Sequence, residues 1–300
     1  MQMIERFLEY ISIEKRYSEH TSTSYRKDLK DFLEFLVQTE AHEDLKKVDK
    51  KIVRNFIIHL SEKKLSKRSI NRKISSLRSF YLFLLKISEI KISPLENISS
   101  LKFYAEKQIP FSKEEMLDFQ QKTEALLENS SLEKLIIETL YQTGMRRAEL
   151  CNLRFSDVDI NKKEVRITGK GNKERIIPIS PDLISDFQKY IQIRNPGEDY
   201  KDYFFINKKG KKLGEKFVYS VVTHYLGLAS SKKKKSPHIL RHSFATHTLD
   251  GGAEISKVKK ILGHASLAST QVYTNADIEQ LKKVFNKAHP RGNKSTDESK

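Results

Sequence analysis

Four residues near the C-terminus have side chains and spacing suited to phosphoryl transfer. Arg241 follows His238 by three residues, and Tyr273 follows His264 by nine residues. Displacement at a phosphodiester builds negative charge on the non-bridging oxygens, and a site without metal must stabilise that charge with fixed donors. Arginine offers a planar fork of donors that stays protonated, so Arg241 and the upstream Arg146 are candidates for this role.

Cleavage of a phosphodiester also requires a nucleophile, for which Ser243, Cys151 and Tyr273 are the candidates. An unperturbed tyrosine has a pKa of ~10, and neighbouring guanidinium charge would favour its phenolate. A phosphotyrosine would retain the energy of the phosphoester bond, so that rejoining the strand would need no ATP. Tyr273 lies in a polar segment, and a role as an aromatic core residue is the alternative.

The leaving alkoxide needs a proton donor. Lys170 stands at the tip of a Gly-Lys-Gly turn, from which its side chain can reach a bound strand. His238 and His264 can serve as acid, base or additional phosphate donors. A zinc site at His238 and His242 is the alternative, because ligands four residues apart share a helix face. Only Ile, Leu and Arg separate these histidines, with no glutamate base, so we expect no metal and no other cofactor.

The composition indicates a globular protein that binds a polyanion. The 300 residues carry a formal net charge of +17, and 38% of them are hydrophobic. A surface this basic favours nucleic acid as the partner, although a lysine-rich surface that serves solubility is the alternative. No run approaches the ~18 apolar residues of a membrane span. Cys151 is the single cysteine and permits no internal disulfide, so we expect a soluble cytoplasmic protein.

The first hundred residues have the periodicity of helices. Apolar side chains recur at helical spacing in three stretches, which comprise Leu29, Phe32, Leu33 and Leu36, then Val48, Ile52, Phe56 and Leu60, then Ile70, Ile74, Leu77, Tyr81 and Leu84. Between Lys63 and Arg78, just before and within the third stretch, stand seven cations and no acid, namely Lys63, Lys64, Lys67, Arg68, Arg72, Lys73 and Arg78. Serines interleave with these cations, which suits contact with a phosphate backbone. A merely solvated face is the alternative.

The pattern breaks near residue 100, where we place a linker over 101–110 between a helical domain at 1–100 and a second domain at 111–288. Strand-like residues at 165–167 and 175–178 flank a Gly-Lys-Gly-Asn turn, which predicts a β-hairpin. A further short strand is expected over 203–206. Helices are expected on both sides of these strands, and the polar residues 289–300 are expected to form a flexible tail.

Four sequence boxes resemble those of the tyrosine recombinase (phage integrase) family. The boxes are TGMRRAEL from Thr143, GKGNKER from Gly169, HILRHSFATH from His238, and LGHASLASTQVYT from Leu262. Their order and spacing match the family's R–K–H-x-x-R–H–Y set, which is specific when all four boxes stand in register. The N-terminal stretches FLEYISIEKRYSEHTSTSYRKDLKDFLEFL and SKRSINRKISSLRSFYLFLL are similar to the core-binding domain of the Xer branch (XerC/XerD-like).

The resemblance implies a role for each matched residue. Tyr273 would attack the scissile phosphate, Lys170 would protonate the leaving oxygen, and His238 would act as acid and base toward the tyrosine. The remaining matched residues would bind the phosphate or orient the site, namely Arg146, Arg241, His264 and Glu149. Lys173 and Arg175, beside the hairpin tip, are expected to contact DNA. Arg147 departs from the family's box, where an apolar residue is common, and would touch DNA or Glu149.

The resemblance also implies a fold and partners. The fold would be mainly α with a small antiparallel sheet in the C-terminal domain, and a SAM-like domain would complete a C-shaped clamp on double-stranded DNA. The protein would be a site-specific recombinase with a 3′-phosphotyrosyl intermediate. It would work in a tetramer at a dif-like site to resolve chromosome dimers, with a second Xer-type recombinase and a DNA translocase as activator. The segment containing Leu281, Val284 and Phe285 would dock on a neighbouring subunit or pack on its own chain.

Three other functions stay open at this point. The integrase of a mobile element shares every motif, although such integrases often carry an additional domain ahead of the helical one. A type IB topoisomerase shares the chemistry. A DNA-binding protein without strand transfer would use the basic faces alone. Neither the target site nor the choice between a XerC-like and a XerD-like protein is readable from the sequence.

Overall fold

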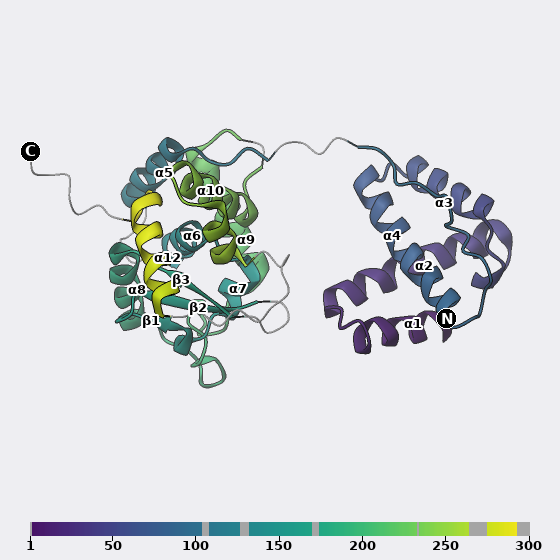
Figure 1. Ribbon diagram of the computed structural model, residues 1–300, viewed down its shortest axis with the longest axis horizontal. Helices are drawn as coiled ribbons and strands as arrows, with labels where there is room; N and C mark the ends of the chain where they lie inside the picture. Colours follow the sequence, from purple (N-terminus) through teal and green to yellow (C-terminus); the bar gives the residue numbers. More distant parts are fainter. Residues whose placement is uncertain are drawn as a thin grey trace, which may run out of the picture. The chain divides into compact units, whose positions relative to one another are not determined.

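The computed structural model describes residues 2–103, 108–126, 132–169, 174–232, 234–263 and 275–292. The chain divides into two units, Met1–Glu106 and Lys107–Lys300, and each unit has its own hydrophobic core. The fold is mainly helical with a small antiparallel sheet in the second unit, which confirms the fold class expected from the sequence (Figure 1). Within the described ranges, no helix has the length and apolar character of a membrane span.

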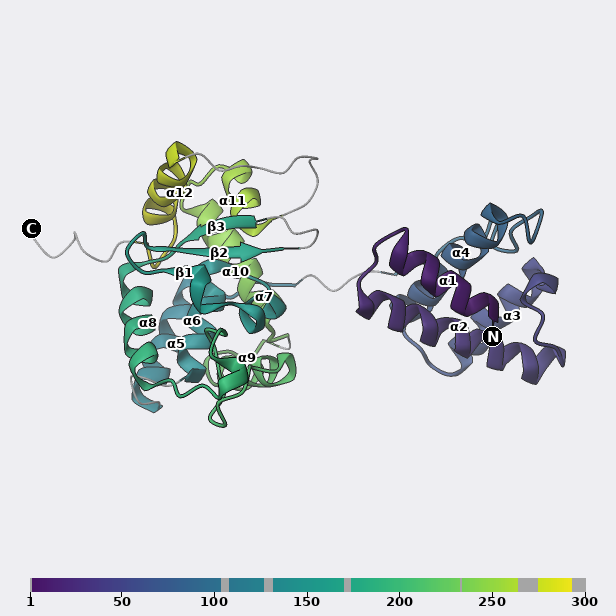
Figure 2. The same cartoon turned by 90° about the horizontal axis from the view of Figure 1, so that it is seen from below.

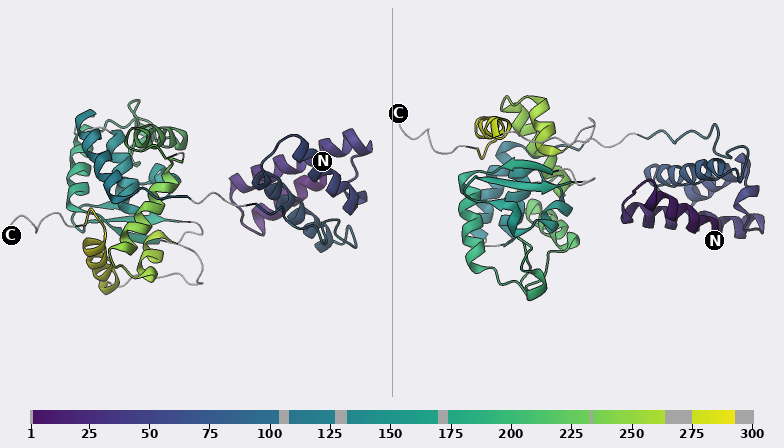
Figure 3. Two further views of the ribbon diagram at one scale, coloured as in Figure 1. Left: turned by 90° about the horizontal axis from the view of Figure 1, so that it is seen from above. Right: turned by 60° about the horizontal axis from the view of Figure 1, so that its bottom comes forward.

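Unit 1 consists of helices packed around α4. The elements are α1 (Gln2–Ile13), α2 (Glu19–Glu40), a 3-10 turn (Leu45–Lys47), α3 (Lys50–Glu62) and α4 (Lys67–Lys86). Ser18, Asp49 and Ser66 cap the starts of α2, α3 and α4 through their side-chain oxygens. Helix α4 contacts each of the other three helices (Figure 3). It is therefore the central element of this unit.

The apolar stripes expected from the sequence form the core of unit 1. All four positions of the α2 stripe and all five of the α4 stripe are buried. In the α3 stripe, Val48, Phe56 and Leu60 are buried, whereas Ile52 packs against the core only in part. Helical periodicity thus placed these side chains correctly because one face of each helix covers the same core.

A buried carboxylate joins α2 to α4. Asp28 is 0% exposed, and it accepts hydrogen bonds from the Ser76 hydroxyl at 2.7 Å and the Lys73 ammonium at 3.1 Å. Arg72 and Asp31 complete the cluster, since Arg72 pairs with Asp28 and Lys73 also pairs with Asp31. Burial of a charge is tolerated here because opposite charges and hydrogen bonds replace the water.

Unit 2 surrounds a three-stranded antiparallel sheet in the order β1-β2-β3. Its elements are α5 (Lys113–Leu126), α6 (Leu132–Thr143), α7 (Arg147–Asn152), a 3-10 turn (Phe155–Asp157), β1 (Val158–Asp159), β2 (Glu164–Thr168), β3 (Glu174–Pro178), α8 (Pro181–Ile193), a second 3-10 turn (Glu198–Tyr200), α9 (Glu215–Ala229), α10 (Pro237–Asp250), α11 (Ile255–Leu262) and α12 (Asn275–Ala288). Val165 pairs with Ile177 in the β2–β3 hairpin, which confirms the predicted hairpin.

Helix α10 is the central helix of unit 2. It contacts α6, α9, α11 and α12, and β3 contacts α11 and α12 (Figure 2). Pro237 starts the helix, where its fixed φ suits the first turn, and Gly251 follows its last residue. Because neighbours cover α10 on several sides, polar side chains such as Ser243 and Thr248 are buried and hydrogen bond to the backbone one turn earlier.

The strand expected over 203–206 does not join the sheet. The third strand is Val158–Asp159, and 203–206 makes only isolated bridges, from Tyr203 to Arg154 and from Ile206 to Lys212. Phe204 and Phe205 are both buried. Two consecutive buried side chains do not fit a half-exposed strand, whose residues alternate between faces.

Residues 289–292 correct the prediction of a flexible tail over 289–300. His289 stacks on Phe285 with ring centroids 5.0 Å apart, and Arg291 is 4% exposed. Arg291 Nη2 lies 3.2 Å from Glu138 Oε1 in α6, and its Nε lies 3.3 Å from Oε2. The polar composition of this segment suggested a tail because the acid that pairs with it lies 153 residues earlier. Residues 293–300 lie outside the described residues.

We predict that Asp28→Ala lowers the free energy of unfolding of unit 1 by about 3 kcal/mol, because it leaves the Lys73 ammonium buried beside a lost partner. Asp31→Ala is the matched control, since Asp31 is partly exposed and its loss should cost about 1 kcal/mol or less. Urea unfolding of the full chain, followed by circular dichroism, measures both. Equal destabilisation by the two variants would contradict the assignment of Asp28 as the principal partner.

Candidate active site

The break between α6 and α7 positions the first arginine. Gly144 adopts φ +60°, and a Cβ there would lie 2.6 Å from the Phe244 ring and 2.8 Å from Leu262. Only glycine fits both the left-handed backbone and this close approach. The turn ends α6 and places Arg146 in extended conformation just before α7. The backbone conformation and the close packing at this position therefore explain why the TGMRRAEL box has a glycine here.

Glu149 holds two arginines with one carboxylate. Arg175 donates from both terminal nitrogens, Nη1 to Oε1 at 2.9 Å and Nη2 to Oε2 at 2.6 Å. Arg146 donates from Nη1 to Oε1 at 2.9 Å and from its backbone N–H to Oε2 at 2.6 Å. Burial by itself would raise the pKa of Glu149, but the hydrogen bonds and charges of Arg175 and Arg146 outweigh it, so the pKa is lowered. The carboxylate thus stays ionised and fixes the Arg146 guanidinium.

Arg175 is a buried structural residue, which corrects its assignment to DNA contact. It is 4% exposed, and besides Glu149 its Nε donates to the carbonyl oxygen of Ile261 at 2.7 Å. A side chain on Gly263 would approach Arg175, with a Cβ 3.1 Å from its Cδ. Because Arg175 is buried and each of its three nitrogens already has an acceptor inside the protein, it is not placed to meet a phosphate. It ties β3 to the end of α11 instead.

Arg241 is a buried residue of α10. Its Nη1 donates to the carbonyl oxygen of Gly144 at 2.5 Å, and its Nη2 donates to that of Leu262 at 2.6 Å. Burial, followed by the positive charge of Arg146, lowers the pKa of Arg241 to about 10, which leaves the guanidinium charged at neutral pH. Two carbonyls at the ends of α6 and α11 therefore hold this cation, and no carboxylate bonds to it within the described residues.

His238 is exposed at the start of α10. Partial burial, with the positive charges of Arg241, His242 and Arg146, lowers its pKa below the ordinary value of 6.5. The imidazole is therefore neutral at pH 7 and can accept a proton.

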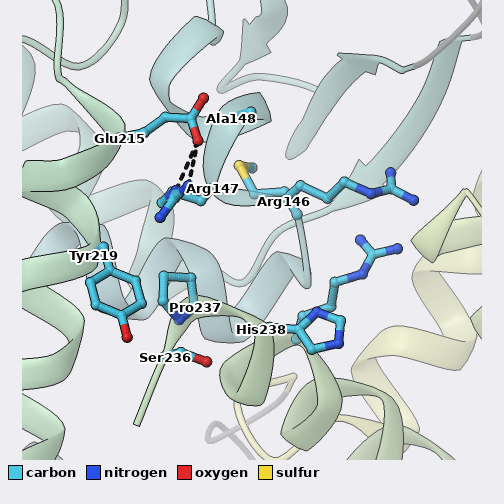
Figure 4. Close-up of a pocket in the computed structure, with 10 residues that line it drawn as sticks. Arg146, Arg147, Ala148, Glu215, Tyr219, Ser236, Pro237 and His238 are labelled. Carbon is cyan, nitrogen blue, oxygen red and sulfur yellow. Dashed lines mark hydrogen bonds and ion pairs between the residues drawn. The ribbon is translucent and has the colours of Figure 1, made fainter. Parts of the chain in front are cut away.

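A pocket of about 370 Å³ brings three of the predicted residues together. It is lined by Met145, Arg146, Arg147, Ala148, Glu215, Tyr219, Ser236, Pro237, His238 and Arg241. Figure 4 shows Arg146 and His238 on one side of this pocket, with Arg147, Glu215 and Tyr219 on the other. Three arginines and a single carboxylate, that of Glu215, line the pocket. Its net charge is therefore positive, which suits an anion.

Two of the three candidate nucleophiles are buried in the core. Ser243 is 0% exposed, and its hydroxyl donates to Ile239 while it accepts from the backbone of Phe111 at 2.8 Å. Cys151 is 2% exposed, and burial raises the pKa of its thiol to about 11. Neither side chain can meet a DNA strand. The third candidate, Tyr273, lies outside the described residues, as do Lys170, Lys173 and His264.

The expected basic face of unit 1 is partly exposed. Five of its cations are exposed, namely Lys63, Lys64, Lys67, Arg68 and Arg72. Arg78 is half-buried and donates to the carbonyl oxygen of Ile98 at 2.7 Å. Lys73 is 4% exposed and pairs with Asp28 and Asp31, which corrects its assignment to the DNA-facing set. Arg72 also pairs with Asp28, whereas Lys63, Lys64, Lys67 and Arg68 can approach a phosphate backbone.

The sequence did not reveal the ion pair between Arg147 and Glu215. Arg147 donates to Glu215 Oε2 from Nε at 2.9 Å and from Nη2 at 2.7 Å, and it makes this pair in place of the expected contact with Glu149. The partner stands 68 residues later. The only sequence signal was the departure of Arg147 from the family's box.

Comparison with known protein families identifies two matching regions. Residues 97–280 match the model described as "Phage integrase family", and residues 4–87 match "Phage integrase, N-terminal SAM-like domain". The chain is 39% identical over 295 residues to "Tyrosine recombinase XerC" of Listeria innocua serovar 6a, with 97% of this chain and 98% of the relative covered. It is 36% identical to the protein of the same name from Staphylococcus carnosus, with the same coverage.

Solved structures share the fold. The XerH site-specific recombinase bound to a palindromic difH substrate has a TM-score of 0.69 and 22% identity, with 94% of this chain and 93% of that chain covered. A lambda integrase dimer bound to a core site has a TM-score of 0.70 and 14% identity, with 91% and 98% covered.

We predict that Glu149→Gln destabilises unit 2 by about 3 kcal/mol at pH 7, because it leaves Arg175 buried without its carboxylate. The pKa of Glu149 is lowered in the folded protein, so its contribution is complete above its ordinary value of 4.5 and is lost as pH falls through the folded value. Urea unfolding of the wild type and of Glu149→Gln at pH 7 and at lower pH measures their free energies of unfolding. The difference between the two free energies should become smaller in acid.

Glu198→Gln is the control, since that side chain is 85% exposed and pairs only with nearby Lys201 within the described residues. A difference between wild type and Glu149→Gln that stays constant from neutral to acid pH would contradict the ionised clamp.

Proposed function

Because the chain belongs to the phage integrase family of tyrosine recombinases, we propose that it cuts and rejoins DNA through a 3′-phosphotyrosyl intermediate as a Xer-type site-specific recombinase. The observation that carries this proposal is the pair Arg146 and Arg241. Both line one pocket with His238, and both are held from behind, Arg146 by Glu149 and Arg241 by backbone carbonyls. Two fixed guanidinium groups can stabilise the charge of a phosphoryl transition state without reorganising.

The first chemical step moves one bond and two protons. The Tyr273 oxygen bonds to the scissile phosphorus while its proton passes to neutral His238, and the bond from phosphorus to the 5′ oxygen breaks. Lys170 gives a proton to that oxygen, which leaves as a 5′-hydroxyl. His264 donates a hydrogen bond to the phosphate, and Glu149 keeps Arg146 oriented. Rejoining reverses each transfer, so the enzyme needs neither ATP nor a redox partner.

Two observations support the role of His238. Partial burial and the cations beside it lower its pKa, so the ring is neutral at pH 7. It also lines the same pocket as both arginines. A protonated imidazole could not take the phenolic proton, and the surrounding positive charge therefore favours the base form before attack.

The substrate in this proposal is double-stranded DNA at a dif-like site, and the role is resolution of chromosome dimers in the cytoplasm. The XerC-named relatives, which match over nearly the whole chain, support this choice over a mobile-element integrase. Exposed cations at the start of α4 provide a surface that can contact the phosphate backbone of DNA.

We further propose that four subunits act together, with a second Xer-type recombinase and a translocase as partners. Leu281 and Phe285 of α12 are buried in the core of their own unit. A contact of these side chains with a neighbouring subunit would therefore require α12 to leave its own core and pack on that subunit.

We predict that the wild-type protein forms a covalent adduct on genomic DNA and that Tyr273→Phe forms none, because only the phenolic oxygen can attack. Adducts trapped with denaturant and mapped by sequencing would define the site. A nicked duplex of that site then measures cleavage directly. An adduct that survives Tyr273→Phe would refute the nucleophile, and its absence from wild type would refute the function.

We also predict that Lys170→Ala slows cleavage of an ordinary duplex by about 100-fold or more, which is the usual contribution of a general acid. A 5′-phosphorothiolate at the scissile position gives a thiolate leaving group that needs no proton, so this substrate should restore the rate of the variant. Arg146→Ala serves as the comparison, because loss of charge stabilisation should slow both substrates. Equal loss on both substrates by Lys170→Ala would contradict its role as the acid.

A further inference from the structure

The wall of the pocket opposite Arg146 has a composition that the proposed chemistry does not use. Arg147, Glu215 and Tyr219 form this wall, from the first residue of α7 and the first two turns of α9 (Figure 4). The Arg147 and Glu215 side chains are 36% and 38% exposed, so both reach solvent. Tyr219 is also exposed, and the Arg147 guanidinium lies 5.8 Å from its ring centroid.

The pairing leaves part of Arg147 available. Nε and Nη2 both donate to the same oxygen, Glu215 Oε2. Among the described residues, Nη1 of Arg147 donates to no protein acceptor. Arginine–carboxylate pairs frequently use both oxygens, as Arg175 does with Glu149. Glu215 thus fixes the guanidinium and leaves Nη1 unused.

Two hydroxyl groups border the same space. Ser236 precedes α10 in the N-cap position, yet its hydroxyl makes no capping hydrogen bond. A serine in this position usually caps the helix, so its hydroxyl is left for another acceptor. Tyr219 lines the same pocket and is 46% exposed, so its hydroxyl is accessible there. Arginine, serine and tyrosine are common donors to the oxygens of a nucleic-acid backbone.

We propose that Arg147, Tyr219 and Ser236 form a second phosphate-binding subsite, which holds a DNA phosphate next to the scissile one. The inference rests on the proposed function, in which Arg146 and Arg241 hold the scissile phosphate at the other side of this pocket. Phosphates repeat along one strand, and Arg146 and Arg147 are consecutive, so a strand that reaches the first arginine brings a neighbouring phosphate toward the second. Glu215 is a positioning residue for Arg147.

The competing explanation is that the ion pair is purely structural. The two explanations differ in the effects that they predict for Arg147→Gln and Glu215→Gln. If the pair only joins α7 to α9, then Arg147→Gln and Glu215→Gln break the same contact and act alike. If Arg147 binds a phosphate, then Arg147→Gln loses that contact, whereas Glu215→Gln removes a negative charge from the subsite and keeps the cation.

The test is equilibrium binding of the full chain to a short duplex of arbitrary sequence across a range of salt concentrations. Each phosphate contact contributes about 0.9 to the slope of log K against log salt. We expect Arg147→Gln to reduce the magnitude of the slope by about 0.9, and Glu215→Gln to leave it unchanged or larger. Equal reductions in both variants, or no reduction in Arg147→Gln, would overturn the subsite.

Two milder variants keep the proposal testable if Arg147→Gln fails to fold. Tyr219→Phe and Ser236→Ala each remove one hydroxyl and should weaken binding about fivefold at fixed salt, with an unchanged melting temperature. Unchanged affinity in both would overturn the subsite. These measurements need no strand cleavage, so a missing covalent adduct would refute the proposed function alone, whereas a missing salt effect would refute this subsite alone.

Discussion

The geometry of the candidate active site depends on the hydrogen bonds that the Glu149 carboxylate accepts. One buried acid receives a bidentate pair from Arg175 and two further hydrogen bonds from Arg146. The first set ties α7 to β3, and the second fixes the Arg146 guanidinium. Because both arginines share this acid, the contact with β3 also holds Arg146 in place. The cation proposed to bind the phosphate is thereby built on rigid elements.

The second arginine is held without any acid. Arg241 bonds to two backbone carbonyls, so its charge is solvated by the ends of helices and is not cancelled. Arg146, Arg147 and Arg241 line the pocket with a single carboxylate, that of Glu215, so the pocket carries a net positive charge. Burial, followed by the positive charge of Arg146, lowers the pKa of Arg241, so the charged form is disfavoured in the free protein. In the proposed function, a bound phosphate would offset that cost.

Much of this arrangement could be predicted from the sequence, because it rests on local patterns. Helical stripes such as Ile70 to Leu84, the hairpin flanking 169–173, and the glycine before Arg146 each depend on residues close together in the chain. The failures share one cause. Lys73 and Arg175 were expected to face DNA and Arg291 to lie in a flexible tail, but their acids stand 45, 26 and 153 residues away. A sequence shows charge directly, whereas the partner that removes that charge from the surface appears only after folding.

The packing of residues 289–292 links the segment after α12 to the candidate active site. Arg291 pairs with Glu138 in α6, the helix that ends at Thr143, three residues before Arg146. A single helix thus joins the segment that follows α12 to the turn before Arg146.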